Sequence, residues 1–386
     1  MSDHIPFEIQ MDIMKKFSVK SLLQLRSVSK AWKSLIDSSD FVKLYSNLQQ
    51  HLLLRYDHQY KLDEPEYVSI VDDHTFPEQK VSLAIPKQVN LLEDSRTIAS
   101  SHGLLCLSGF YGGRWMVVLW NVSIRKAVAV DVPNVAGGKY KTLLGFGVCG
   151  ETCDPKIVKI AYIDHCYQME SIPESIPWQV EVFTLSTRAW RQPHSSNFPR
   201  KSIRFGRKQV VLDGFLYWIA TEWIATDGGF RGINLIISFE TTFEQFREIN
   251  LPNALAHYQP YRELFISKLR ESLVVLQRNE YHSNSFFVWM MEDGIPKSFT
   301  KIFTICTPGE TLISVPGFRK SGEPIIEIST YLWHPYEDNS WLVVYEPYSK
   351  DISDIGISEW MCSFSLYSYM ETLLLLDQPD LTTYDI

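Results

Sequence analysis

The sequence predicts a small all-α unit of three helices followed by an all-β, propeller-like domain of about six blades. Three observations indicate this fold class. Apolar residues recur with helical spacing over the first fifty positions, short apolar runs rich in β-branched and aromatic residues follow from about residue 51, and those runs repeat at intervals close to the length of one blade. The resulting domains are residues 1–48 and 49–386.

The composition is that of a folded protein, with 45% hydrophobic residues in a chain of 386. The chain has no apolar run of the roughly 18 residues that a membrane helix needs, and its start lacks the features of a signal peptide. We therefore expect a soluble protein of the cytoplasm, the nucleus or both, with no membrane partner. The six cysteines lack the spacing of a disulfide framework or a zinc site, so we expect reduced thiols and no cofactor.

Charge is divided unevenly along the chain. Residues 1–50 carry seven Lys and Arg against five Asp and Glu, a net of +2, which leaves 30 against 40, a net of −10, for the rest. Binding of nucleic acid depends on a clustered basic surface, which the long C-terminal part lacks. A nucleic-acid partner is therefore not expected.

Each of the three helices is predicted from apolar side chains that lie on one face. These residues are Ile5, Ile9, Ile13, Met14 and Phe17 in the first helix, Leu22, Leu23 and Leu25 in the second, and Val28, Trp32, Leu35 and Ile36 in the third. Pro6 suits the first turn of the first helix, and Ser18 and Ser21 are candidate caps for the second.

A unit of about forty residues usually needs a metal, disulfides or a partner to stay folded. This one contains no cysteine and has more apolar residues than three short helices can cover. We therefore expect part of its surface to stay open for a partner to bury. The alternative is a helical cap packed against the following domain.

The segment from Ile5 to Val42 resembles the F-box of plant F-box proteins, which we place at residues 3–45. The shared features are Ile5-Pro6, Val19-Lys20-Ser21-Leu22-Leu23, Arg26-Ser27-Val28, the pair Lys30 and Trp32, and Leu35-Ile36 with Phe41. The resemblance implies binding to a Skp-type adaptor protein and, through it, to a cullin. The implied adaptor-binding residues are Ile5, Pro6, Ile9, Ile13, Leu22, Leu23, Val28, Lys30 and Trp32.

Two positions depart from the pattern of that family. Phe17-Ser18 stands where Leu-Pro is usual, and Ser29 stands where Cys is frequent. Both changes are mild, so we expect them at most to weaken the adaptor contact.

The candidate strands are short apolar runs between turn signals. They are Leu52-Arg55, Val68-Val71, Leu104-Leu107, Met116-Trp120, Val158-Tyr162, Val180-Phe183, Phe215-Ile219, Leu235-Phe239, Leu273-Leu276, Phe286-Trp289, Ile325-Ile328 and Trp341-Tyr345. An aromatic residue ends the same kind of strand at Trp120, Phe183, Phe239, Trp289 and Tyr345, with gaps of 63, 56, 50 and 56 residues. These gaps are close to the about 50 residues of a kelch-type blade.

Six repeat units can be counted, and the two ends of the series are incomplete. The first unit, near His51, lacks an opening strand, whereas an apolar run from Cys362 to Asp377 follows the sixth. A C-terminal strand that completes the first blade would remove an exposed sheet edge. An array of β-sandwiches is the alternative.

The region from Ser101 to about Leu376 resembles the F-box-associated domain that follows plant F-boxes. The landmarks are Ser101-x-Gly103-Leu104-Leu105-Cys106, Leu119-Trp120-Asn121 with Arg125-Lys126, Gly145-Phe146-Gly147, Val182-Phe183 to Trp190, Gly214 to Trp218, Ile237-Ser238-Phe239 with Phe246, and Val288-Trp289-Met290. Val122 replaces a usual Pro, and Phe299 a usual Trp. Because the kelch glycine doublet is not regular, this domain is kelch-like only in architecture.

No set of residues indicates catalysis. The glycine pairs at 112–113, 137–138 and 228–229 lack the helix and the lysine of a phosphate loop, so they are interpreted as turns. Cys149 and Cys153, near His165-Cys166, do not have the spacing of a known zinc finger. Asp and Glu recur in no fixed context, and no glycosidase pair stands out. A propeller enzyme with a helical cap remains an alternative.

The most irregular loops recur between the same two strands of each unit, and in a propeller they would emerge on one face. They are Asp57-Tyr67, Gly109-Arg114, His165-Trp178, Glu222-Arg231, Arg278-Ser285 and His334-Asn339. Aromatic residues among polar neighbours are typical of protein-recognition hot spots. The candidate target-binding residues are Tyr60, Tyr111, Trp178, Phe230, Tyr281 and Tyr336. Packing between blades is the alternative role for several of these aromatics.

Together these features predict a noncatalytic substrate-recognition subunit of an SCF-type (Skp-cullin-F-box) ubiquitin ligase, which brings an unidentified target protein to ubiquitination. The alternative is an interaction protein that binds the adaptor without assembling a ligase.

Overall fold

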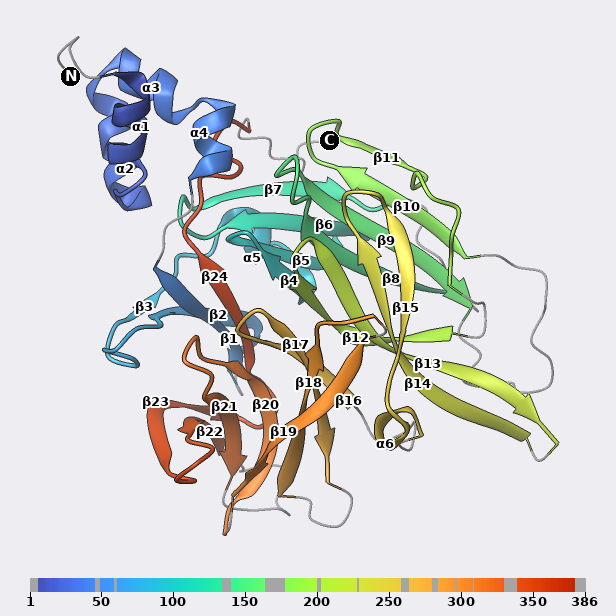
Figure 1. Cartoon of the computed structure of the whole chain (residues 1–386). Coiled ribbons are helices and arrows are strands. Elements are labelled where there is room, and N and C mark those ends of the chain that lie inside the picture. Colours follow the sequence, from blue (N-terminus) through green and yellow to red (C-terminus); the bar gives the residue numbers. More distant parts are fainter. Residues whose placement is uncertain are drawn as a thin grey trace. The chain divides into compact units, whose positions relative to one another are not determined.

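A computed structural model describes residues 6–45, 49–58, 61–133, 140–163, 178–199, 203–227, 229–257, 264–279, 284–295, 297–307, 309–329 and 339–378 (Figure 1). The chain forms two compact units. The first comprises Met1–Pro133 and Ser365–Ile386, and the second comprises Asn134–Phe364.

The first unit begins with four helices. They are α1 (Phe7–Met14), α2 (Val19–Val28), α3 (Lys30–Ile36) and α4 (Ser39–Leu44). Serine side chains cap the start of three of them. The hydroxyl oxygens of Ser18, Ser29 and Ser38 accept hydrogen bonds from the backbone N–H group of the third residue of α2, α3 and α4, respectively.

The prediction of three helices was wrong by one, because a fourth helix, α4, follows α3. This helix has six residues, too few to produce a recognisable apolar period. It is held instead by the Ser38 cap and by burial of Phe41, which is 0% exposed, and of Tyr45, just after its end. The burial depends on tertiary contacts and the cap is a single local hydrogen bond, so the periodicity of the sequence does not reveal the helix.

Two four-stranded antiparallel sheets follow in the described part of the first unit. The sheet β24-β1-β2-β3 contains Ser365–Met370, Gln50–His58, Lys61–Val71 and Lys80–Ser82, and the sheet β4-β5-β6-β7 contains Glu93–Ser101, Leu104–Tyr111, Arg114–Asn121 and Lys126–Asp131. The C-terminal strand β24 pairs with β1, with Tyr367 opposite Leu53. The predicted completion of the first blade by a C-terminal strand is therefore confirmed.

The second unit contains four more sheets of four antiparallel strands. They are β8 to β11 (Tyr140–Val148, Pro155–Ile163, Gln179–Thr184, Ala189–Arg191), β12 to β15 (Ile203–Leu212, Phe215–Thr226, Gly229–Glu240, Gln245–Asn250), β16 to β19 (Leu264–Leu269, Ser272–Arg278, Ser285–Glu292, Ser298–Cys306) and β20 to β23 (Thr311–Phe318, Pro324–Ser329, Asn339–Tyr345, Ile352–Trp360). A four-stranded meander is the blade of a β-propeller. The strands of the described residues thus form six blades, as predicted.

Two one-turn helices interrupt the β structure, α5 (Lys87–Asn90) and α6 (Asn253–Ala256). Each begins directly after a proline, Pro86 or Pro252. The fixed φ of proline ends the preceding extended segment and suits the start of a helix. Each proline follows a strand by a few residues, since β3 ends at Ser82 and β15 at Asn250.

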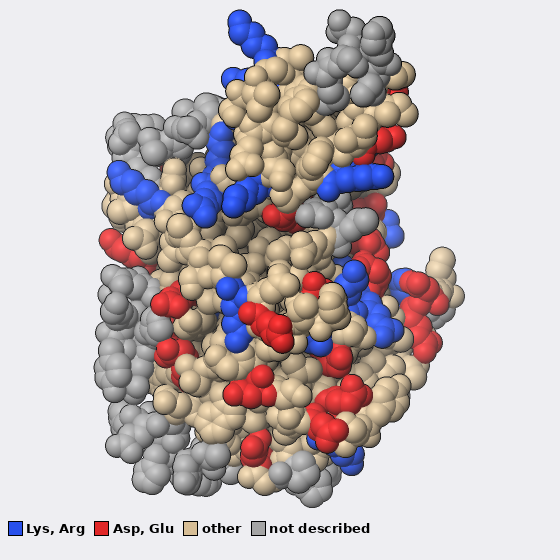
Figure 2. Space-filling model, turned by 90° about the vertical axis from the view of Figure 1, so that its left-hand side faces the viewer, with Lys and Arg blue, Asp and Glu red and all other residues tan. Residues whose placement is uncertain are grey.

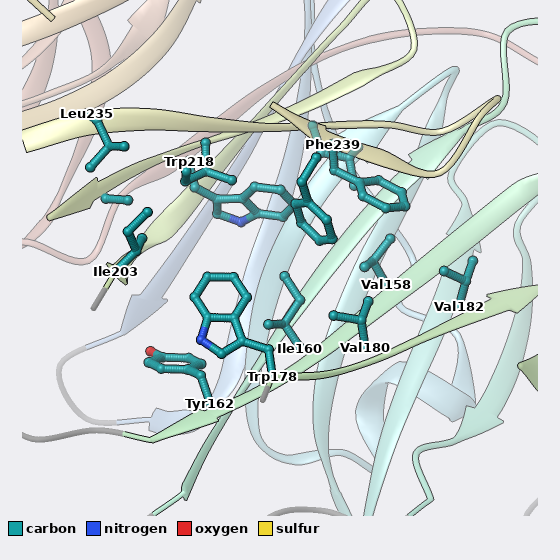
Figure 3. Close-up of a cluster of buried hydrophobic side chains, with 14 residues drawn as sticks. Val158, Ile160, Tyr162, Trp178, Val180, Val182, Ile203, Trp218, Leu235 and Phe239 are labelled. Atoms are coloured by element: carbon teal, nitrogen blue, oxygen red, sulfur yellow. The ribbon is translucent and has the colours of Figure 1, made fainter. Parts of the chain in front are cut away.

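The core lies between the faces of neighbouring sheets within each unit. In the first unit, Trp120 of β6 packs with Tyr67 of β2 at a ring distance of 5.1 Å, in an edge-to-face arrangement. In the second unit, Trp218 of β13 and Val158 of β9 belong to one buried cluster (Figure 3). Large side chains from adjacent blades therefore interdigitate.

Candidate functional site

An apolar surface lies on the helices of the first unit. Ile9 and Ile13, one turn apart on α1, are 49% and 42% exposed, and Val28 at the end of α2 is 68% exposed. Phe17, between the two helices, is 40% exposed. Large apolar side chains exposed on one small helical unit are candidates for an interaction site. We call Ile9, Ile13, Phe17 and Val28 the apolar helical surface.

The other implied adaptor-binding residues take different places. Pro6 and Lys30 are exposed, and Leu23 and Trp32 are half-buried, so all four side chains have surface available to a partner. Leu22, by contrast, is 0% exposed and supports the helices from inside. Ile5 lies outside the described residues.

Arg26 and Asp37 of the same helical unit form a bidentate ion pair. Arg26 at the end of α2 donates from Nη2 to Asp37 Oδ2 at 2.9 Å and from Nε to Asp37 Oδ1 at 2.5 Å. Such a paired contact fixes two planar groups in one geometry. It therefore ties α2 to the residue that ends α3. Figure 2 shows a broad uncharged area in the upper part of the molecule, with Lys and Arg mainly at its left and lower sides and Asp and Glu at its right edge.

The two departures from the F-box pattern, Phe17-Ser18 and Ser29, have structural roles. Ser18 Oγ accepts from Ser21 N at 3.3 Å, and Ser29 Oγ accepts from Trp32 N at 3.1 Å. Each therefore caps a helix, a function that neither a proline side chain nor a thiol performs as well. The carbonyl of Phe17 accepts the Tyr45 hydroxyl at 2.8 Å, which joins the start of α2 to the end of α4.

The predicted recognition loops occupy equivalent positions in the blades. Each connects the second and third strands of its sheet: β1–β2, β5–β6, β9–β10, β13–β14, β17–β18 and β21–β22. Recurrence between the same two strands is therefore confirmed, but most of Asp57–Tyr67 and of Glu222–Arg231 belongs to strands rather than to loops. That the loops share one face remains a prediction.

The tip of the β5–β6 hairpin carries Tyr111, whose partly buried ring packs on the core of the first unit. Gly112 and Gly113 both have positive φ, 56° and 76°, and open space where a Cβ would lie, so the turn is unobstructed. Beside it, the ring of Phe110, 42% exposed, stacks on Trp115 at 6.3 Å. Sequence reasoning missed Phe110, although its position two residues before the glycine pair was a usable signal.

Trp178 is placed in the core rather than at the surface. It is 6% exposed, and its ring lies 5.0 Å from that of Phe205 and 6.3 Å from that of Tyr162 (Figure 3). Direct contact of this ring with a target does not fit that burial. Its role is packing between the blades β8 to β11 and β12 to β15, the alternative already considered for such aromatics.

Four of the six candidate target-binding side chains cannot be placed. Tyr60, Tyr281 and Tyr336 lie outside the described residues. Phe230 belongs to β14, where it pairs with Ala225, but its side chain is not described.

The β13–β14 hairpin extends beyond its sheet. The pairing of β13 with β12 ends at Glu222, and the pairing of β14 with β15 ends at Leu235. The pairing of β13 with β14 continues as far as Thr226 and Gly229. On this two-stranded arm, residues 223–232, the Arg204 guanidinium lies 5.5 Å from the Trp223 ring and Ile224 is 40% exposed. Sequence reasoning missed Ile224 because it continues an apolar strand run.

Chemistry other than binding has little support in the described part of the chain. No cluster of three or more His, Cys, Asp or Glu there could hold a metal ion, and none of its helices is long and apolar enough to span a membrane. The five cysteines that are described, Cys106, Cys149, Cys153, Cys306 and Cys362, are all free thiols. His165 and Cys166, considered with Cys149 and Cys153, lie outside the described residues.

Comparison with protein families gives this architecture a name. A model of the F-box associated beta propeller domain matches residues 65–366, and a model of the F-box domain matches residues 2–44. The chain belongs to the F-box associated beta propeller family. Helices α1 to α4 are thus its F-box, and the six sheets are its F-box-associated propeller.

Curated relatives carry the same description. The chain is 25% identical to the F-box protein CPR1 of Arabidopsis thaliana over 98% of its own length and 90% of the relative. A second F-box protein of that plant is 25% identical over 84% of this chain and 76% of the relative. The homologues are therefore plant F-box proteins that align along most of the chain.

Solved structures are more distant. TolB from Acinetobacter baumannii aligns with a TM-score of 0.43 and 8% identity, covering 90% of this chain and 71% of that protein. A β-fructofuranosidase from Bombyx mori aligns with a TM-score of 0.37 and 11% identity, covering 70% and 63%. Neither likeness is close enough to support an argument about this F-box protein.

Proposed function

We propose that the protein is the noncatalytic substrate-recognition subunit of an SCF-type ubiquitin ligase. Its F-box binds a Skp-type adaptor and through it a cullin, and its propeller binds a target protein in the cytoplasm, the nucleus or both. The observation that supports adaptor binding is the apolar helical surface, with Val28 68% and Ile9 49% exposed in a unit that buries other apolar side chains such as Leu22.

The mechanism is proximity. A target and a charged conjugating enzyme held in one complex react at a high effective concentration, and the bond-making chemistry belongs to the other subunits. The loops between the second and third strands of each blade provide the target site. Residues 1–48 form the adaptor-binding domain and residues 49–386 the kelch-like recognition domain.

Val28→Asp tests adaptor binding. The variant places a charge in an interface that would otherwise bury an apolar side chain, so we expect it to weaken binding of the purified chain to a Skp-type adaptor by at least about 2 kcal/mol. Isothermal titration calorimetry measures the change. Because Val28 is already exposed, the fold should be unaffected.

Val81→Asp is the matched control, since Val81 of β3 is 60% exposed and lies outside the F-box. It should bind like the wild type. Equal adaptor affinity for Val28→Asp and the wild type would contradict the proposal. If the adaptor binds but cullin does not join the complex, the alternative of an adaptor-binding protein without ligase assembly is supported.

A further inference from the structure

The segment that follows the last strand, Glu371–Gln378, is packed into the first unit. Its four consecutive leucines, residues 373–376, are each at most 9% exposed. The fully buried Asn121, at the end of β6, donates from Nδ2 to the carbonyls of Thr372 at 3.0 Å and Leu374 at 2.7 Å. Buried amide donors with two good acceptors hold a backbone in one conformation.

The same segment reaches the F-box. Glu371 Oε2 accepts a hydrogen bond from the backbone N–H of Val19 at 3.3 Å, a contact between residues 352 positions apart. Val19 is the first residue of α2, a ten-residue helix, and is 0% exposed. The first N–H groups of a helix have no partner inside it and carry partial positive charge, so a carboxylate there is stabilising.

Glu371 also acts on two other parts of this junction. Burial, and then the negative charge of Glu371, raise the pKa of Tyr45, the residue after α4. Burial lowers the pKa of His51 in β1, and the charge of Glu371 opposes that shift. The carboxylate thus lies within electrostatic reach of α2, of the end of α4 and of the first strand of the propeller.

We propose that Glu371–Gln378 is a clasp that fixes the F-box on the first two blades, and that Glu371 is its positioning residue. The chain between Tyr45 and Gln50 is one connection between the F-box and the propeller. The hydrogen bond at α2 adds a second, non-covalent connection, which restricts the orientation of the F-box. The inference goes beyond the proposed function, because it concerns the orientation of the F-box and requires neither an adaptor nor a target.

Hydrogen exchange of the full-length chain measures the clasp at its contact. In Glu371→Ala the Val19 amide loses its acceptor, so its exchange should accelerate at least about tenfold, the loss expected for one hydrogen bond to a charged group. Glu371→Gln keeps an acceptor without the charge and should give a smaller acceleration. Glu78→Gln, an exposed carboxylate of the same unit, is the control and should leave the Val19 exchange rate unchanged.

Single-molecule energy transfer measures orientation. Dyes attached through non-natural residues at the exposed positions Lys33 of α3 and Arg114 of β6 should give a narrow distance distribution in the wild type and in Glu78→Gln, and a broad one in Glu371→Ala. Unchanged Val19 exchange together with a narrow distribution in Glu371→Ala would overturn the clasp. Adaptor affinity, measured separately, tests the proposed function and stays at the wild-type value if only the clasp is lost.

Discussion

An aromatic side chain in a propeller loop can serve packing or recognition; Trp178 illustrates packing, and Tyr111 is our candidate for recognition. Trp178 is 6% exposed between two blades, whereas Tyr111 lies at an open hairpin tip beside the exposed ring of Phe110. Both residues follow from the same sequence argument, aromatics among polar neighbours. Only contacts from other blades decide which ring is covered.

Alanine substitution should separate the two roles. Trp178→Ala leaves a cavity in the core and should lower the free energy of unfolding by about 3–5 kcal/mol in denaturant titration. Tyr111→Ala should change stability less and should reduce capture of a target protein from a cell extract. Tyr348→Ala is the control. Tyr348 is 97% exposed in the turn between β22 and β23, and its substitution should leave capture of the target protein unchanged. Equal destabilisation by Trp178→Ala and Tyr111→Ala would contradict this assignment.

At the level of elements, the twelve candidate strands inside the repeat units are the second or third strands of their sheets, whereas the predicted C-terminal strand, β24, lies at a sheet edge. Their residues are largely buried on both faces; in β21 every residue from Pro324 to Ser329 is buried. A strand covered on both faces is a continuous apolar run, which is readily recognised. First and fourth strands are different: β4 is bulged between Glu93 and Arg96, and only two of the nine residues of β19 are buried. Their mixed patterns explain why sequence reasoning missed them.

The C-terminal closure of the first blade depends on a close approach at Gly103. Its φ is +76°, and an added Cβ would lie 2.3 Å from the carbonyl oxygen of Met370 at the end of β24. Gly113 has the same φ of +76° but open space around it. The two glycines therefore share a left-handed backbone conformation and differ in the space available to an added Cβ.

Gly113→Ala should destabilise the chain by about 1–2 kcal/mol, the cost of a left-handed conformation. Gly103→Ala carries that cost and also a clash, so its loss should be larger by about 1–3 kcal/mol. Thermal unfolding of both variants measures the difference. A Gly103→Ala variant no less stable than Gly113→Ala would be inconsistent with β24 lying against this turn.

On the scale of the whole molecule, an ion-pair cluster joins two consecutive blades, the sheet β8 to β11 and the sheet β12 to β15. Glu244, fully buried in the turn after β14, accepts from Arg191 of β11 at 2.6 and 2.7 Å and from Lys156 of β9 at 2.9 Å. Burial would raise the pKa of Glu244, but the hydrogen bonds from Arg191 and Lys156 and the charge of Lys156 lower it from 4.5 to about 2. The carboxylate therefore stabilises the folded state.

Glu244→Gln should leave Lys156 buried without its ion-pair partner and lower stability at neutral pH by about 3–5 kcal/mol. Because the folded pKa is below the unfolded value, the stabilisation is complete above pH 4.5 and is lost as the pH falls toward 2. Thermal unfolding across that window should therefore show a steeper loss in the wild type than in Glu244→Gln. Glu248→Gln, exposed on β15, should keep the wild-type slope, and parallel slopes in all three proteins would refute the assignment.

The sequence by itself determined the helical start and the β-rich remainder, the central strands of six blades, the C-terminal strand that completes the first blade, and the resemblance to an F-box. Each of these features can be recognised from neighbouring residues, because the side chains that a helix or strand buries recur with the period of that element. The tertiary structure alone decided that Leu22 and Trp178 are covered, that Glu371 reaches α2 and that Glu244 joins two blades. Those contacts connect residues far apart in sequence, and local periodicity carries no information about which distant side chains will meet.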